Sequence, residues 1–313
     1  MEEIQFNEQE HRYYDGTKIE YTSVTTLIGK YTNTYDTEFW AMYTALKEHN
    51  YIVKPVPEKR SIWCRNVLYK LKDLYRDDLF VLWVDEVKAR WKAVSGEACF
   101  RGNMIHNELE SNIDSSKQDF NKETNLNIRR GADRCLKTEH DLDRTELQEK
   151  YPIVYERLKG YINLGFSIYA EKRVHLPEFG VAGMIDVPLI KGKHFAILDW
   201  KTNKEEMHST SGYFKKANIG GKWVKTKVWV ETGEYLKFPL EHLPASKLHT
   251  YALQLSTYSR ILEYWGYIPM KNHLELIHFT LEGEPKLIKL PYLREEVDMM
   301  FAHHKESRLL IEP

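Results

Sequence analysis

The chain contains 313 residues, of which 42% are hydrophobic and 29% are charged, and its formal net charge is −1. This length and composition are ordinary for a globular protein with a sizeable core. No run of about 18 apolar residues is present, which excludes a transmembrane helix, and the acidic start of the chain does not resemble a signal peptide. We therefore expect a cytoplasmic protein of a bacterial or phage-infected cell, with no membrane partner.

The first half of the chain combines short strands with a long helical region. Residues 4–22 read as short strands, with a turn signal at Asp15-Gly16. Apolar residues at helical spacing dominate 24–110. The segment 111–150 is polar with few aliphatic residues, which indicates an exposed insertion or a mobile helical arm.

Strands and helices alternate in the second half. We predict helices over 151–165, 247–265 and 292–309, strands over 167–176, 181–190, 194–201, 273–280 and 286–290, and a hairpin within the polar stretch 203–246. No internal repeat is evident. The order predicts a single domain over 1–313 of the α/β or α+β class, with a central mixed sheet flanked by helices and its core over 167–290.

Three acidic residues are predicted to face one another across three of these strands. A two-residue turn at 192–193 places Asp186 directly opposite Asp199, roughly 5 Å apart at Cβ. A turn centred on 178–179 places Glu171 opposite Asp186 in the same way. Like charges side by side destabilise a sheet, so either a divalent cation such as Mg²⁺ or Mn²⁺, or nearby lysines at an exposed surface, must offset them.

Lysines and aromatic residues are interleaved in 203–246, directly after the last of these strands. Such a stretch is either a solvated face or the wall of a phosphate-binding groove, and its proximity to the acids favours a groove. We take Lys204, Lys215 and Lys216 as candidate DNA-binding residues. A bulge near Pro188 would break the predicted register.

The segments "GVAGMIDVPL" and "FAILDWKT" carry Gly183, Asp186, Asp199 and Lys201. Together they resemble the core of the PD-(D/E)xK nuclease superfamily, and in particular its RecB-type exonuclease branch, which includes phage exonucleases and a mitochondrial genome maintenance exonuclease. A lone D-x-K tripeptide is weak evidence. Its position after an apolar strand, behind a G-x-x-D strand, makes the match more specific.

Two helical motifs of the same branch add to the resemblance. "RGNMIHNELE" matches a G-x-x-x-H helix through Gly102 and His106, and "LQLSTYSRILE" matches a Q-x-x-x-Y helix through Gln254 and Tyr258. The motifs occur in the family's order. The resemblance spans about residues 21–262, and it implies a restriction-endonuclease-like core.

The resemblance also implies roles for the strand residues. Asp186 and Asp199 would hold one or two Mg²⁺ or Mn²⁺ ions, with His106 and the backbone carbonyl of Trp200 as further ligands. Lys201 would orient the attacking water or stabilise charge on the phosphoryl oxygens.

Other matched residues keep two interpretations. Glu171 would hold a water beside the ion, or lie in an exposed row of acids. Gln254 and Tyr258 would position the lysine or the scissile backbone, or serve helix packing alone. Ser23 and Thr25, in a Ser-Val-Thr element that also resembles the branch, would donate hydroxyls to a DNA phosphate or cap the following helix.

Cofactors other than the metal are not expected. Cys64, Cys99 and Cys135 are scattered and form no CxxC pair, so we expect buried free thiols, with no zinc ribbon, disulfide framework or iron–sulfur cluster. No G-x-x-x-x-G-K-[ST] motif occurs, so we expect no nucleotide cofactor. A helicase motor or recombination partner would be a separate protein.

Three functions remain open at this point. The first is a metal-dependent DNA exonuclease acting on single strands or free ends, an activity used in DNA replication, repair and recombination. The second is a structure-specific endonuclease of the same fold, which cuts flaps or junctions. The third is a DNA-binding module without catalysis, against which the complete set of His106, Asp186, Asp199 and Lys201 argues.

Overall fold

The computed structural model describes residues 4–7, 12–15, 20–49, 67–70, 72–73, 79–113, 135–281 and 283–309. The chain divides into two compact units, Thr34–Arg101 and Met1–Asn33 with Gly102–Pro313. This division differs from the single domain expected from the sequence, because the described apolar residues of the smaller unit form a core of their own. None of the helices in the described ranges is long and apolar enough to cross a membrane.

The smaller unit contains α2 (Thr37–Glu48) and the first part of α4 (Leu79–Ile113), which continues into the larger unit. Asp36 caps α2, because its carboxylate accepts a hydrogen bond from the Phe39 amide at 2.9 Å. The core of this unit includes Phe39, Met42, Val84 and Val87. The helical character predicted for 24–110 is thus confirmed within the described residues.

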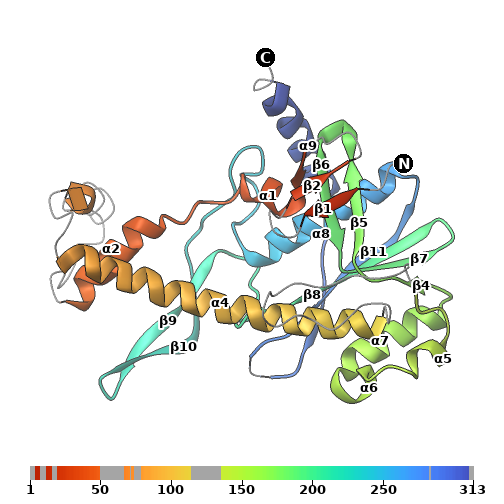
Figure 1. Cartoon of the computed structure of the whole chain (residues 1–313), viewed down its shortest axis with the longest axis horizontal. Coiled ribbons are helices and arrows are strands. Elements are labelled where there is room, and N and C mark those ends of the chain that lie inside the picture. The colour runs from red at the N-terminus through yellow and green to blue at the C-terminus, as the bar shows by residue number, and fades with distance from the viewer. Residues whose placement is uncertain are drawn as a thin grey trace. The chain divides into compact units, whose positions relative to one another are not determined.

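The larger unit contains two five-stranded sheets and a separate hairpin (Figure 1). The first sheet has the order β1 (Gln5–Asn7), β2 (Arg12–Tyr14), β3 (Glu20–Ser23), β6 (Val181–Ile185) and β5 (Lys172–Leu176). The second has the order β12 (Lys286–Lys289), β11 (Ile268–His278), β8 (His194–Lys201), β7 (Val187–Lys191) and β4 (Ser167–Ile168). The hairpin consists of β9 (Gly212–Ile219) and β10 (Lys222–Glu231).

Two predicted strands are each split by a bend between the sheets. Lys172 pairs with Ile185 in the first sheet, and Ser167 pairs with Ile190 in the second. Both pairs belong to the register that the turn centred on 178–179 predicts. This register therefore continues from one sheet into the other across the bend. Asp186 lies at this bend, between β6 and β7, where its carbonyl accepts a hydrogen bond from the Glu171 amide at 2.8 Å.

Helices cover both faces of the second sheet. Apolar side chains of α1 (Val24–Gly29), α8 (Lys247–Tyr264) and α9 (Arg294–Leu309) share one core with β8. Those of α7 (Pro152–Asn163) and the end of α4 share another core with the same strand. The predicted helices over 151–165, 247–265 and 292–309 are confirmed, with boundaries that differ by a few residues.

Alternation along β8 assigns each side chain to one of these cores. Phe195 and Ile197 belong to the core under α8, whereas Ala196 and Leu198 belong to the core under α7. Successive strand residues point to opposite faces, so the odd-numbered positions that follow face α8 as well. This places the two polar residues near the end of β8 beneath helix α8.

Part of the predicted exposed arm belongs to the core instead. The segment 114–134 lies outside the described residues, but 135–150 forms the short helices α5 (Glu139–Leu142) and α6 (Leu147–Lys150). Leu136, Leu142 and Leu147 are buried against α7 and the second sheet. A few well-spaced leucines therefore anchor this polar segment.

The cysteine expectation is wrong in part. Cys99 is exposed on α4, Cys135 is half-buried, and Cys64 lies outside the described residues. Cys99 lies on the solvent side of a helix that has only one packed face.

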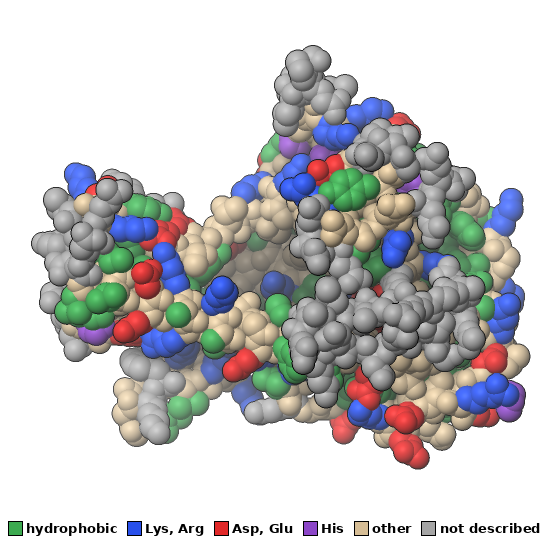
Figure 2. Space-filling view, viewed as in Figure 1, with side chains coloured by type: hydrophobic (Ala, Val, Ile, Leu, Met, Phe, Trp, Pro, Cys, Tyr) green, Lys and Arg blue, Asp and Glu red, His purple; other side chains and the backbone are tan. Residues whose placement is uncertain are grey.

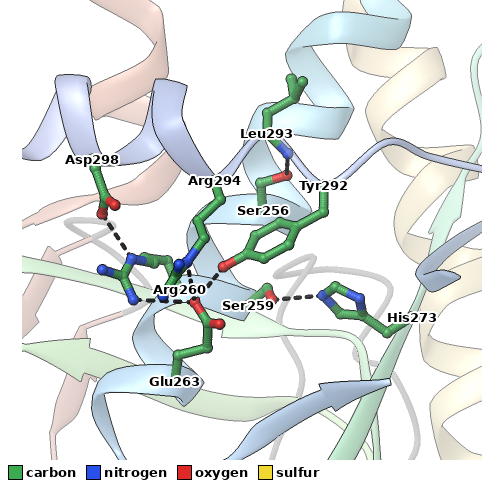
Figure 3. A network of polar contacts seen from close by, with 9 residues as sticks. All are labelled: Ser256, Ser259, Arg260, Glu263, His273, Tyr292, Leu293, Arg294 and Asp298. Carbon is green, nitrogen blue, oxygen red and sulfur yellow. Dashed lines mark hydrogen bonds and ion pairs between the residues drawn. The ribbon is translucent and has the colours of Figure 1, made fainter. Parts of the chain in front are cut away.

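A network of charged and hydroxyl groups joins α8 to the start of α9 (Figure 3). Arg260 donates to Asp298 at 2.7 Å and pairs with Glu263 at 3.1 Å. Glu263 also accepts from the Tyr292 hydroxyl at 2.5 Å and from Arg294 at 3.3 Å. These bonds hold the C-terminal helix against α8 and so support the face of α8 that covers β8.

Candidate active site

The two aspartates predicted to face each other lie side by side in the structure. β7 and β8 pair in the expected register, with Val187 opposite Leu198. Beyond that pair, the Asp186 carboxylate accepts a hydrogen bond from the Trp200 amide at 3.2 Å. Asp199 is only 1% exposed. The bend at Asp186 thus turns its side chain toward β8 instead of leaving it in a strand pair.

Lys201 supplies a cation at this position. Its Nζ lies 2.5 Å from Oδ2 of Asp199, and its side chain is only 15% exposed. The same Nζ lies 5.1 Å from the ring centroid of Tyr251 on α8. The Tyr251 hydroxyl in turn donates to Asn203 Oδ1 at 2.6 Å. Because α8 covers this face of β8, the pair is a buried one and not a surface salt bridge.

The charges of this group do not balance. Burial raises the pKa of Asp199, the Asp186 carboxylate raises it further, and Lys201 opposes both effects. Burial lowers the pKa of Lys201, but the two carboxylates outweigh burial and raise it above its usual value. Two carboxylates share one ammonium in a poorly solvated place, so a further cation there would favour the ionised form of Asp199.

His106 reaches the same place from the end of α4. Its Nδ1 lies 3.6 Å from Oδ2 of Asp186. A Cβ on Gly102, one turn earlier, would lie 3.1 Å from Oγ1 of Thr202, so the glycine lets α4 approach the chain directly after β8. The G-x-x-x-H motif therefore brings an imidazole to the carboxylates.

Glu171 occupies its predicted backbone position without completing a row of three acids. Its backbone is left-handed, with φ of 46°, and its amide pairs with the Asp186 carbonyl. Among the described residues, no three side chains of His, Cys, Asp or Glu stand close enough together to hold a metal ion. The candidate donors are therefore the pair Asp186 and Asp199, with His106 Nδ1 at 3.6 Å from the first.

The Q-x-x-x-Y residues meet each other and a glycine. Gln254 Nε2 donates to the Tyr258 hydroxyl at 3.3 Å. Tyr258 is 3% exposed, and burial raises the pKa of its hydroxyl. A Cβ on Gly183 would lie 2.5 Å from the Tyr258 ring. Tyr258 thus packs α8 against β6, which favours the packing interpretation, while Gln254 reaches the neighbouring cleft.

The two hydroxyl residues near the N-terminus differ in role. Ser23 caps α1, since its Oγ accepts from the Thr26 amide at 3.1 Å, and it is buried. Thr25 is exposed and lines the cleft. The structure therefore favours the capping interpretation for Ser23, whose Oγ is also hydrogen-bonded to the Thr25 hydroxyl at 3.1 Å.

A cleft of about 1070 Å³ lies next to the site: Tyr251 lines it, but Asp186, Asp199 and Lys201 do not. It reaches from Tyr251 and Gln254 of α8, past Thr25, to the β9–β10 hairpin. Of the candidate DNA-binding lysines, Lys204 and Lys216 line it. Lys215 does not, because neighbouring strand residues point to opposite faces. We therefore no longer count Lys215 among the residues expected to line the groove.

The surface outside the cleft carries no broad basic area in the view of Figure 2. Lysine and arginine side chains are interspersed there with aspartate and glutamate, as the net charge of −1 leads one to expect. Any recognition of an anionic polymer on this face must therefore depend on local groups such as those of the cleft.

One contact of the site was not anticipated from the sequence. Tyr251 lies under Lys201, one helical turn before Gln254 on α8. Spacing of three residues on a helix places both on one face, and that signal was present in the sequence. Comparison with protein-family models, curated proteins and solved structures gave no match for this chain.

Proposed function

We propose that the protein is a metal-dependent nuclease of the PD-(D/E)xK type, and that it acts as an exonuclease on single-stranded DNA or DNA ends. The observation that carries the proposal is the meeting of Asp186, Asp199 and Lys201 beneath α8, whose Tyr251 and Gln254 line the neighbouring cleft. The chain order around it supports the same type: a bent hairpin, strand β8, helix α8, and then β11 parallel to β8.

The residues present suit a hard divalent cation. Asp186 and Asp199 offer carboxylate oxygens, and their uncompensated charge favours a cation at that point. His106 offers a ring nitrogen beside Asp186, which suits Mn²⁺ better than Mg²⁺. A bound ion would polarise the phosphodiester and make a water molecule more acidic.

The chain's own groups would do the remaining work. Lys201 forms an ion pair with Asp199, and its ammonium is held over the Tyr251 ring, so its position is set before a substrate arrives. From there it can hold a water molecule or stabilise charge on a phosphoryl oxygen, a contribution of about 10²–10³ in rate for one positioned donor. Gln254, at the edge of the cleft, can bond the strand's backbone.

One assay separates the three functions. Linear and covalently closed circular single-stranded DNA are incubated with the full chain in Mg²⁺ or Mn²⁺, beside the Asp186→Asn variant. An exonuclease degrades the linear strand and spares the circle. Cutting of the circle supports the endonuclease instead, and no cutting of either supports a binding module. Activity that Asp186→Asn retains would point to a contaminating nuclease or another site.

A further inference from the structure

The cleft face of the β9–β10 hairpin carries two unusual cross-strand pairs. Phe214 faces Trp229 and Lys216 faces Lys225, and all four residues line the cleft. Two lysines directly opposite each other repel. Lys225 is paired with Glu205, whereas no ion pair engages Lys216 within the described part of the chain. The face therefore holds a positive charge whose natural partner is an external anion.

Flat aromatic rings are fixed beside these lysines. Trp229 stacks on His208, with ring centroids 3.8 Å apart and planes 8° apart, and its Nε1 donates to Thr210 at 3.1 Å. Phe214 meets Trp229 edge-on at 5.1 Å. Tyr213, also in the cleft, is 56% exposed. The Phe214 and Trp229 rings are held in place before any ligand binds, which reduces the entropy lost on binding.

The charges of the whole cleft agree with an anionic ligand. Its Glu205 and Glu206 are engaged by lysines, and Glu234 is the one lining carboxylate that has no lysine partner among the described residues. Lys204 and Lys247, like Lys216, have no carboxylate partner among the residues that the structure describes. The cleft is thus lined by several lysines free to bind anions, and at its far end it reaches Tyr251, which lies under Lys201.

We propose that this hairpin face binds the unpaired bases of a nucleic acid strand, with a base stacked on Phe214 and the adjoining phosphate held by Lys216. Stacking on a side chain requires a base whose face is free, so a single strand fits and an intact duplex does not. The inference rests on the proposed nuclease function only where it implies that the bound strand is later cut. Binding of the strand to the hairpin does not require cleavage.

Binding is tested with the full chain carrying Asp186→Asn, in Ca²⁺, so that no strand is cut. Fluorescence anisotropy measures the affinity for a labelled thymidine oligonucleotide, the same strand in a blunt duplex, and an abasic strand of equal length. We expect the single strand to bind more tightly than the duplex. Phe214→Leu should weaken single-strand binding about 5- to 100-fold, and Phe214→Tyr should preserve it, because stacking needs only an aromatic ring.

Lys216 has a matched control, Lys215, on the same β-strand, β9. Lys216→Ala should weaken binding and reduce the salt slope by about 0.7, as expected for one lost phosphate contact to a single strand. Lys215→Ala, next to it on the opposite face, should change neither. On the abasic strand, the effect of Phe214→Leu should vanish while that of Lys216→Ala remains. Thermal melting of each variant confirms that it is folded.

Equal binding of duplex and single strand would overturn the inference, as would unchanged affinity in both Phe214→Leu and Lys216→Ala. An equal loss of affinity in Lys215→Ala would mean that the lysines act through general positive charge and not through a specific phosphate contact. Failure of the nuclease proposal looks different. In that case the strand binds through Phe214 and Lys216, but the wild-type chain leaves it uncut in Mg²⁺ and Mn²⁺.

Discussion

At the scale of single residues, one buried charge imbalance dominates the candidate site. Asp199 is 1% exposed, lies beside Asp186, and has Lys201 as its ammonium partner. Burying a charge is costly unless it is paired. Removing the repelling charge of Asp186 should therefore stabilise the fold, whereas breaking the pair between Asp199 and Lys201 should destabilise it. The two aspartates are therefore equivalent for cleavage but not for folding.

Asp186→Asn and Asp199→Asn should both abolish cleavage, because each removes a carboxylate needed by the cation. Without divalent ions, Asp186→Asn should raise the melting temperature, since it relieves repulsion and the amide oxygen can still accept from the Trp200 amide. Asp199→Asn should lower it, because Lys201 loses its buried partner. Cleavage assays and thermal melting check both; activity retained in the two variants would remove the site assignment.

Lys201→Ala should slow single-turnover cleavage by about 10²-fold or more while DNA affinity in Ca²⁺ stays close to wild type. Breaking a buried pair should also destabilise the metal-free chain by about 3–5 kcal/mol. Mg²⁺ should stabilise this variant more than it stabilises the wild type. Without the ammonium, a bound ion is the only cation that offsets the charges of Asp186 and Asp199. Lys201→Arg should not restore the rate, since the bulkier planar guanidinium cannot place a donor where the compact ammonium lies beside Asp199. Wild-type rates in Lys201→Ala would make this lysine structural.

At the scale of elements, glycines set how closely helices approach the strands of the candidate site. Gly183 on β6 lies against the Tyr258 ring of α8, and Gly102 on α4 lies against Thr202 after β8. Both contacts join a helix motif to a strand motif. They give a packing reason for the glycines of the G-x-x-D and G-x-x-x-H patterns, independent of any chemistry at the metal.

Gly183→Ala should destabilise the protein by about 1–3 kcal/mol, because its Cβ would lie 2.5 Å from the Tyr258 ring and force α8 or the ring to move. Gly96→Ala is the matched control: it lies within α4, and no atom lies within 4 Å of its added Cβ. That variant should gain about 0.5–1 kcal/mol. Denaturant unfolding measures both, and equal effects would contradict the close approach of α8 to β6.

At the scale of the whole molecule, stability should depend on pH through buried histidines. Burial lowers the pKa of His273 to about 4, and burial together with Lys30 and Arg308 lowers that of His304 to about 4. His273 is bonded to Ser259 at 2.7 Å, beside the network that joins α8 to α9 (Figure 3). In the unfolded chain, both would titrate near the ordinary value of about 6.5.

Between about pH 6.5 and pH 4 the unfolded state binds more protons than the folded state, so the free energy of unfolding should fall as the pH falls through this window. Each histidine should contribute roughly 2–3 kcal/mol to that loss. His273→Gln and His304→Gln should each flatten the slope, whereas the exposed His194→Gln should leave it unchanged. Urea unfolding at several pH values tests this, and a slope that survives both buried substitutions would assign it to other groups.

Local patterns determined much of this protein by themselves. The turn at 192–193 and the period-two alternation were enough to predict the register that brings Asp186 to Asp199, and the same arithmetic held across the bend. Helix spacing predicted α7, α8 and α9 to within a few residues. These features depend on backbone geometry between neighbours in the chain, which a sequence expresses directly.

Only the tertiary structure decided how those pieces meet. It bent one hairpin between two sheets at Asp186, turned Asp199 and Lys201 into a buried pair under α8, and placed Tyr251 beneath the lysine. It also buried part of the polar segment before α7. Such outcomes depend on packing between residues far apart in the chain, where burial and contact are set by whole elements and no local periodicity records them.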